Sequence, residues 1–173
     1  MADGTFAVLM LIAGLTDMGL NYCGTEVGCL GKTPDTARLA LSAGSTIKRQ
    51  AEETGEVYIR YDLGHKRGPF GQALGLSVGE GGETWFGFGS TYTVPFGRSG
   101  GYMELHSMPG LYASNDGFDL GGPIAFRSGL ELGYEMRSGV RLAVSYDHRS
   151  NAGLYGDNPG VETVQLRMSF PTR

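Results

Sequence analysis

The 173-residue sequence has little of several features that mark common protein classes. It has two cysteines, Cys23 and Cys29, with no histidine near them, which is weak support for a metal site. Charged residues make up only 18% of the chain and the net charge is −4, so no basic surface attracts nucleic acid. The longest apolar run, Phe6 to Leu15, is shorter than the ~17 to 25 residues of a membrane helix, so a protein that spans the membrane by helices is excluded.

Glycine is the abundant residue instead. The chain holds 30 glycines, which is about 17% of its length against a usual value of ~7%. They follow no G-X-Y period and only 7 prolines accompany them, so a collagen-like fibre is excluded. With 10% aromatic residues and low charge, disorder is also a poor description. This composition favours a glycine-rich β protein.

The N-terminal region contains the longest apolar run of the chain. Its apolar run has the length of the hydrophobic part of a signal peptide, but Asp3 precedes it where Lys or Arg is usual, and no clear A-x-A site follows. We therefore expect residues 1–33 to be an N-terminal segment, an incomplete signal peptide or a periplasmic leader, and residues 34–173 to be a single domain. Cys23 and Cys29 close a small disulfide loop or remain thiols, and the sequence leaves this open.

From about Asp35 the sequence alternates between apolar and polar residues in short segments separated by Gly, Pro, Asn and charged clusters. No helical stripe interrupts them. Tight connections such as Arg137-Ser138-Gly139 fit hairpins, so an antiparallel up-and-down meander is expected. Eight strands are predicted: Thr36 to Ile47, Glu56 to Leu63, Gln72 to Val78, Thr84 to Val94, Tyr102 to Leu111, Ala125 to Met136, Val140 to Ser150 and Val161 to Phe170.

Each predicted strand has one apolar and one mixed face, because successive side chains point to opposite sides of a strand. In the second strand Val57 and Ile59 share a face opposite Glu56 and Arg60. A soluble barrel would turn the apolar face inward, whereas an outer-membrane barrel turns it toward lipid. The charges of both signs on the mixed face and the even strand number favour the second arrangement. We predict an all-β fold, an eight-stranded antiparallel up-and-down transmembrane β-barrel.

Three residues capable of acyl-transfer chemistry are expected at one rim of this barrel. His148 and Ser150 close the apolar row of the seventh strand. Their Cα atoms are expected to lie about 6.7 Å apart, because a strand rises ~3.3 to 3.4 Å per residue. Glu162 opens the apolar row of the eighth strand, which the loop Asn151 to Gly160 folds back beside the seventh. Ser150 would be the nucleophile, His148 its base, and Glu162 the group that orients the imidazole.

An oxyanion donor is also required. The side-chain amide of Asn151, or a backbone N–H that follows the nucleophile, is the candidate. The alternative is that these polar residues form only a solvated rim, because charges near the membrane interface cost little. Glu104, Glu131 and Glu135 are interpreted as an interior charge network with the arginines rather than as a glycosidase pair.

The stretch His148-Arg149-Ser150-Asn151-Ala152, followed by Asn158-Pro159-Gly160 and Glu162, resembles the C-terminal signature of the PagL-type lipid A 3-O-deacylases. The spacings from His to Ser and from His to Glu match the Ser-His-Glu set of that family. The likeness covers about the last 75 residues well and the first 35 not at all. One departure is the C-terminus, Phe170-Pro171-Thr172-Arg173, which lacks the terminal aromatic residue typical of outer-membrane barrels.

The resemblance implies a bacterial outer-membrane enzyme that hydrolyses the ester-linked acyl chain at the 3-position of lipid A without cofactor or metal. Its substrate would be lipid A or lipopolysaccharide, its surroundings outer-membrane lipids, and a homodimer is compatible with it. The resemblance also implies that the triad lies on the lipid-facing wall at the outer-leaflet side. The alternative is a barrel without enzymatic activity, either a membrane adhesion or stability protein or a soluble, lipocalin-like ligand binder.

Overall fold

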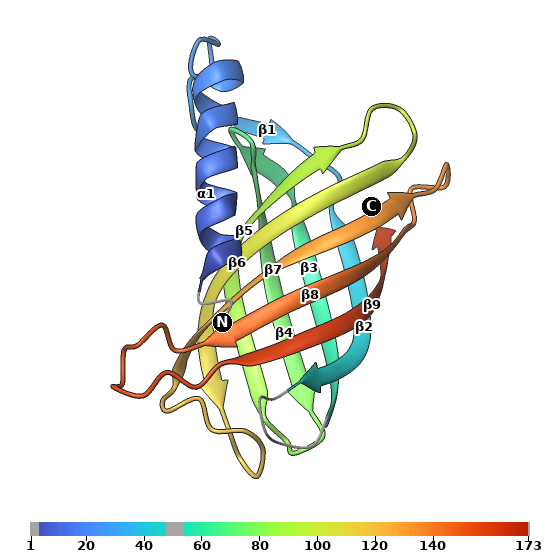
Figure 1. The fold of residues 1–173 in the computed structure, drawn as a ribbon. Helices are drawn as coiled ribbons and strands as arrows, with labels where there is room; N and C mark the ends of the chain where they lie inside the picture. The colour runs from blue at the N-terminus through green and yellow to red at the C-terminus, as the bar shows by residue number, and fades with distance from the viewer. Residues whose placement is uncertain (1–3, 48–53, 173) are drawn as a thin grey trace.

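The computed structural model describes residues 4–47 and 54–172, which form a β-barrel with a helix on its outer wall (Figure 1). The helical part is α1 (Thr5–Asp17), which continues into the short π-helix η1 (Met18–Tyr22). A short strand, β1 (Lys32–Pro34), leads into the barrel. The barrel strands are β2 (Arg38–Ile47), β3 (Thr54–Arg67), β4 (Phe70–Gly79), β5 (Thr84–Pro95), β6 (Gly101–Ala113), β7 (Ile124–Glu135), β8 (Arg141–Ser150) and β9 (Val161–Pro171).

The strands from β2 to β9 pair antiparallel with their neighbours in chain order, and β2 also pairs with β9, which closes the barrel. Closure brings two backbones together at Gly44, where a Cβ atom would overlap the carbonyl oxygen of Val164. Glycine is needed at this position because no side chain fits between the strands. All eight predicted strands are present, so the predicted eight-stranded antiparallel barrel is confirmed.

The predicted strand ends differ from the observed ones mainly in β3, which was expected to end at Leu63 and continues to Arg67. Its pairing with β4 shifts register between Asp62 and Lys66, and Gly64 in this irregular stretch has a φ of +68°. The bulge interrupts the alternation on which the prediction depended. The extension gives β1 a partner, since Lys32–Pro34 pairs with His65–Arg67. Strand β1 itself was not predicted.

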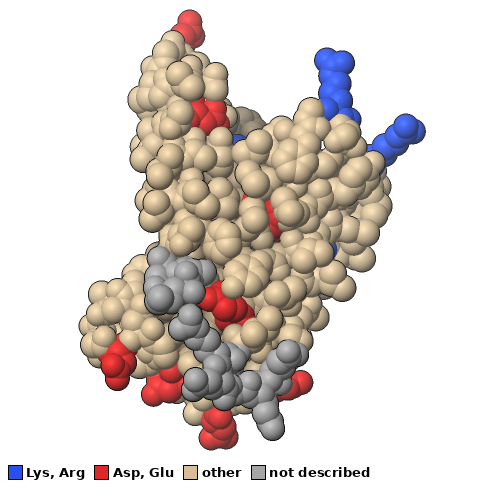
Figure 2. Space-filling model, in the orientation of Figure 1, with Lys and Arg blue, Asp and Glu red and all other residues tan. Residues whose placement is uncertain are grey.

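The apolar faces of the strands point outward. Leu111 and Leu166 are 65% and 71% exposed, and the outer wall carries similar side chains around the barrel: Leu39, Leu41, Val57, Ile59, Val78, Phe86, Phe88, Leu132, Val144 and Met168. Figure 2 shows a broad belt on this face with few charged residues, most of which lie toward its two ends. This is the arrangement of a membrane barrel, and a soluble barrel with an apolar interior is thereby excluded.

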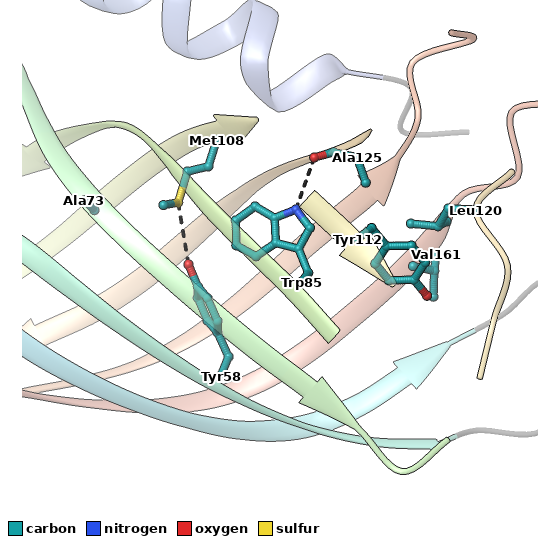
Figure 3. Close-up of a cluster of buried hydrophobic side chains, with 8 residues drawn as sticks. All are labelled: Tyr58, Ala73, Trp85, Met108, Tyr112, Leu120, Ala125 and Val161. Carbon is teal, nitrogen blue, oxygen red and sulfur yellow. Dashed lines mark hydrogen bonds between the residues drawn. The ribbon is translucent and has the colours of Figure 1, made fainter. Parts of the chain in front are cut away.

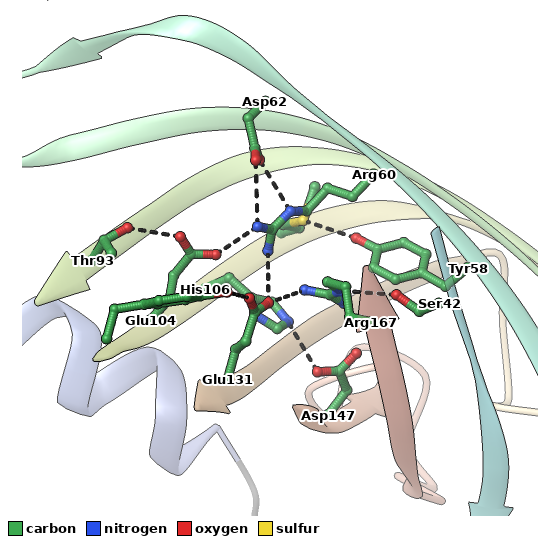
Figure 4. Close-up of polar contacts among 12 residues, drawn as sticks. Ser42, Tyr58, Arg60, Asp62, Thr93, Glu104, His106, Glu131, Asp147 and Arg167 are labelled. Carbon is green, nitrogen blue, oxygen red and sulfur yellow. Dashed lines mark hydrogen bonds and ion pairs between the residues drawn. The ribbon is translucent and has the colours of Figure 1, made fainter. Parts of the chain in front are cut away.

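Charged side chains from many strands fill the middle of the barrel (Figure 4). The guanidinium of Arg60 lies 3.0 Å from Asp62 and 2.6 Å from Glu104, and Arg167 forms an ion pair with Glu131. A second group joins Glu56 to Arg127, Arg149 and Gln165. The predicted interior network is therefore confirmed for Glu104 and Glu131. Glu135 pairs with Arg38 and Arg141 at the barrel end where β8 begins.

An apolar cluster closes the interior at the opposite end, where β8 ends (Figure 3). Trp85 is fully buried in it, and its Nε1–H donates to the carbonyl oxygen of Ala125 at 3.1 Å. The remaining members are Tyr58, Ala73, Met108, Tyr112, Leu120 and Val161. Val161 is the first residue of β9 and Leu120 lies in the loop before β7, so this cluster supports the rim at which the predicted triad lies.

The N-terminal helix lies against the outer faces of β5, β6 and β7 (Figure 1). The helical stretch Thr5–Tyr22 is long and apolar enough to cross a membrane by length and composition. The expectation that no segment reaches this length was wrong, because Thr16 and Asp17 do not end the helix. After it, Cys23 and Cys29 form a disulfide, which answers the question the sequence left open.

Candidate functional site

The predicted triad lies where β8 ends and β9 begins. His148 and Glu162 are directly opposite each other in the antiparallel pairing of these strands. Ser150 is the last residue of β8, two residues after His148 and on the same outer face. The meeting of His148 and Glu162 follows from register, because the loop between the strands aligns residues that are 14 positions apart in the sequence.

A hydrogen bond joins the imidazole to the carboxylate. Nδ1 of His148 lies 2.9 Å from Oε1 of Glu162. Nε2 of the same ring is buried and has no hydrogen-bond partner among the described residues. When the carboxylate accepts from Nδ1–H, Nε2 is the basic nitrogen. The ring is thus oriented to take a proton from a hydroxyl at Nε2, and the hydroxyl two residues away belongs to Ser150.

His148 and Ser150 are both buried, although they belong to the outer face of β8. His148 is 3% exposed and Ser150 6%, whereas Val144 on the same row is 50% exposed. Ser150 is opposite Phe126 of β7, and His148 is opposite Ser128. His148 and Ser150 are therefore buried within an otherwise exposed, apolar wall. A shielded polar site of this kind strengthens the electrostatic interactions within it.

The loop after β8 is fixed to the loop before β7 by the Asn151 side chain. Its Nδ2 donates to the carbonyl oxygens of Leu120 at 2.6 Å and Asp157 at 2.7 Å, and its Oδ1 accepts from the N–H of Gly153 at 2.7 Å. Ala152 has a φ of +54°, unusual for a residue with a side chain. Both Nδ2 hydrogens of Asn151 are thus engaged in holding the loops together. The sequence suggested this amide as an oxyanion donor and did not indicate its loop contacts.

Two further contacts to the triad were not identified from the sequence. A Cβ atom on Gly160 would lie 2.7 Å from Cε1 of His148, so the bare backbone of Gly160 packs against the imidazole. The side chain of Tyr146 interacts with the Glu162 carboxylate from one row below His148. The alternation in β8 already placed Tyr146 on this face. The sequence did not predict the contact between Gly160 and His148, because this contact depends on how the loop folds.

These groups together suit covalent acyl transfer. A hydroxyl nucleophile, a base with a free basic nitrogen and a carboxylate that orients the base lie side by side on one face. The predicted residues His148 and Glu162 are brought into contact, and Ser150 lies beside them at the strand end. Among the residues that the structure describes, no group of three or more His, Cys, Asp or Glu could hold a metal ion.

Comparisons with known proteins agree with this fold. The model of the family "Lipid A 3-O-deacylase (PagL)" matches residues 46–171. The structure is similar to the crystal structure of the outer membrane enzyme PagL, with a TM-score of 0.61 and 21% identity over 79% of this chain and 100% of that one.

Two other membrane barrels share the architecture. A de novo designed transmembrane β-barrel has a TM-score of 0.60 and 11% identity, over 81% of this chain and 98% of the design. Neisserial surface protein A has a TM-score of 0.54 and 12% identity, over 82% of this chain and 99% of that protein. These likenesses concern the fold. No curated protein matches the chain.

Proposed function

Because this chain belongs to the lipid A 3-O-deacylase (PagL) family, we propose that it removes the 3-linked acyl chain of lipid A with Ser150, His148 and Glu162 as its catalytic residues. At the level of the family it is an ester hydrolase of the bacterial outer membrane that acts on lipid A. The observation that carries the finer proposal is the His148–Glu162 hydrogen bond of 2.9 Å beside Ser150.

In the first half of the reaction, Ser150 Oγ attacks the ester carbonyl carbon while its proton passes to Nε2 of His148. Glu162 stabilises the imidazolium that forms, through Nδ1. The C–O bond of the ester then breaks, and His148 returns the proton to the departing 3-hydroxyl of the sugar. The acyl group remains on Ser150 as an ester. A water molecule, deprotonated by the same imidazole, releases the fatty acid in the second half.

The oxyanion of each tetrahedral intermediate requires donors. Since the Asn151 side chain donates both Nδ2 hydrogens to Leu120 and Asp157, we assign this role to backbone N–H groups that follow the nucleophile, with that of Asn151 as the first candidate. The side chain of Asn151 then serves catalysis by fixing the conformation of the backbone around Ala152.

The substrate chains would lie on the apolar wall of β8 and β9. Val144, Val164 and Leu166 are 50%, 39% and 71% exposed and continue from the site toward the middle of the barrel wall. There, the small side chain of Ala43 lies in a shallow hollow of about 620 Å³ in the outer surface. Aliphatic side chains line the hollow: Leu41, Val57, Ile59, Leu142 and Met168. A lipid at this position keeps its chains in hydrocarbon while its ester meets Ser150.

The triad is tested by substitution in the full-length protein, refolded in detergent and incubated with lipid A. We expect Ser150→Ala and His148→Gln to lower turnover by about 10⁴-fold or more, and Glu162→Ala by ~10² to 10⁴-fold, because the orienting group usually contributes less than the nucleophile or base. Mass spectrometry of lipid A measures loss of the 3-linked acyl group.

Ser45→Ala is the matched control, since Ser45 lies on the exposed outer face of β2 and pairs with Val164 outside the triad. Each variant must migrate as the compact folded form on an unheated gel. Wild-type turnover in folded Ser150→Ala would refute the proposed nucleophile. A folded wild-type protein that leaves lipid A unchanged would refute the substrate. A homodimer stays a prediction, which the mass of the detergent complex tests.

A further inference from the structure

The helix α1 packs along one defined row of the barrel wall. Neighbouring strands pair Phe70 with Tyr92, Tyr92 with Leu105, Leu105 with Leu130, and Leu130 with Tyr146, so these five side chains form a continuous diagonal row on the outer face. This row runs across five strands and ends at Tyr146, the neighbour of Glu162.

One stripe of α1 meets this row. Met10 is 4% exposed and packs in a cluster with Tyr92 and Leu105, which Phe6 and Ala13 join. These positions recur at the i, i+4 and i+7 spacing of a single helix face. At the Tyr146 end, the ring of Phe6 lies edge-on to that of Tyr146, with 5.8 Å between centroids.

The two surfaces are complementary in size. Gly14 faces the ring of Phe70 so closely that a Cβ atom on Gly14 would overlap the ring. The helix is thus smallest at Phe70, whereas the larger Met10 packs on Tyr92 and Leu105, and Phe6 meets Tyr146 at the other end of the row. Small residues at such contacts are how helices approach closely within a membrane, where the hydrophobic effect does not drive association.

The opposite face of α1 suits lipid rather than water. Its exposed side chains are large and aliphatic: Val8, Leu9, Leu11, Ile12 and Leu15, each 48 to 62% exposed. The last turn carries Asp17, the acidic residue of the helix, which the Asn21 amide contacts at 2.7 Å. An apolar patch of this size is unfavourable in water and ordinary in hydrocarbon.

Both ends of the helix are attached to the barrel. Beyond its C-terminal end, the disulfide Cys23–Cys29 closes a turn, and the carbonyl oxygen of Gly31 accepts from the N–H of Gly68 at 3.1 Å. Strand β1 then adds to β3. The contact between Phe6 and Tyr146 holds the other end.

We propose that α1 remains on the folded barrel as a lipid-embedded helix and forms a wall on the β6–β7 side of the triad, so that lipid A acyl chains reach Ser150 from the β9–β2 side. The helix covers Leu105 and Leu130 on the first side, whereas Val164, Leu166 and the hollow beside Ala43 stay open on the second. The direction of substrate approach rests on the proposed function, and the docking of the helix does not.

The first test is the intact mass of the protein isolated from outer membranes. We expect residues 5–22 to be present. A mature chain that begins after Asp17 would overturn the proposal, whatever its activity.

The second test compares Gly14→Leu with Gly19→Leu, a matched change at a position where a Cβ atom meets nothing within 4 Å. We expect Gly14→Leu to displace the helix, to lower the temperature at which the folded form is lost on a gel, and to raise the apparent KM for lipid A about tenfold with little change in kcat. Gly19→Leu should match the wild type. Equal behaviour of the two variants would overturn the docking.

Phe6→Ala provides a milder change that leaves the rest of the packing intact, with Leu9→Ala on the exposed face as its control. A rise in apparent KM for Phe6→Ala alone supports the wall next to the site. If Gly14→Leu lowers stability while KM stays unchanged in both Gly14→Leu and Phe6→Ala, the direction of approach is refuted. If the wild type does not deacylate lipid A, the proposed function fails, and the mass and gel results still decide the docking.

Discussion

At the scale of single residues, the site depends on how the imidazole of His148 is held. Glu162 fixes it from one side through Nδ1, and the backbone of Gly160 packs against Cε1 from another. Glycine is required at position 160 because the imidazole of His148 occupies the space that a side chain would fill. Proline precedes this glycine and Glu162 follows two residues later, so the loop ends in a short, closely packed connection to β9.

Gly160→Ala is therefore expected to lower deacylation strongly without unfolding the barrel. The added Cβ atom would lie 2.7 Å from Cε1 of His148, and the imidazole must move to make room. A displacement of about 1 Å at a catalytic group can reduce the rate ~10²-fold. Turnover of lipid A and the gel migration of the folded form are the measurements.

Gly156→Ala is the control, because Gly156 lies in the same loop at a φ of +90° with open space around its Cα. It strains the loop without touching the ring. If both variants lose the same activity, loop strain explains the effect and the packing of Gly160 on His148 does not.

At the scale of elements, the rim is held by contacts between loops rather than by strand pairing. The loop after β8 leaves the sheet at Asn151, turns through Ala152 in the left-handed region and returns at Gly160. Asn151 is fully buried and bonds to Leu120 in the loop before β7. Tyr155 adds a second link, since its hydroxyl oxygen accepts from the N–H of Ile124 at 3.3 Å.

Asn151→Ala is expected to loosen both loops while the barrel stays folded. It removes the two bonds from Nδ2 and the one to Oδ1, each worth about 0.5 to 1.5 kcal/mol net. We expect faster proteolytic cleavage between residues 114 and 123 and between 151 and 160. Activity should fall with it, because the backbone after Ser150 loses its fixed conformation.

Limited proteolysis of the refolded protein measures the effect, with the exposed Asp116→Ala as control. Loops that stay protected in Asn151→Ala would contradict the bridging role of this side chain. If protection is lost and full activity remains, the loop conformation is not needed for catalysis.

At the scale of the whole molecule, the barrel is a shell whose interior is joined by ion pairs. Glu56 of β3 lies 2.9 Å from Arg127 of β7 and 2.6 Å from Arg149 of β8, and it accepts from Gln165 of β9 at 2.9 Å. One carboxylate thus connects strands on different sides of the barrel. Arg149 is also the residue between His148 and Ser150, so the interior network and the outer site share the end of β8.

Glu56→Ala is expected to destabilise the whole barrel by about 3 to 5 kcal/mol, because it leaves Arg127 and Arg149 with less compensation in a buried interior. Unfolding by urea from lipid vesicles, followed by the loss of the compact form on a gel, measures the free energy of unfolding. Glu80→Ala in the exposed turn after β4 is the control. A change below about 0.5 kcal/mol, typical of surface substitutions, would show that the network contributes little.

The sequence by itself determined the eight strands, their two unlike faces and the spacing of the three residues proposed for the site. Alternation with a period of two is local, so it is visible in segments such as 56–63 and 125–136 without any partner strand. The spacing of His148, Ser150 and Glu162 is local in the same sense, since one loop joins their strands. Those features needed only the geometry of a strand and one turn.

The tertiary structure alone decided what depends on contacts between distant segments. Only the folded barrel shows which groups surround Arg60 and Glu56, because their partners Glu104 and Arg127 come from other strands. Likewise, only the folded loops show that the Asn151 amide is engaged and that Gly160 touches His148. The row on which α1 packs consists of five residues from five strands, which lie side by side because of the register between neighbouring strands. No stretch of sequence contains that row, which is why the helix pattern alone could not predict its partner.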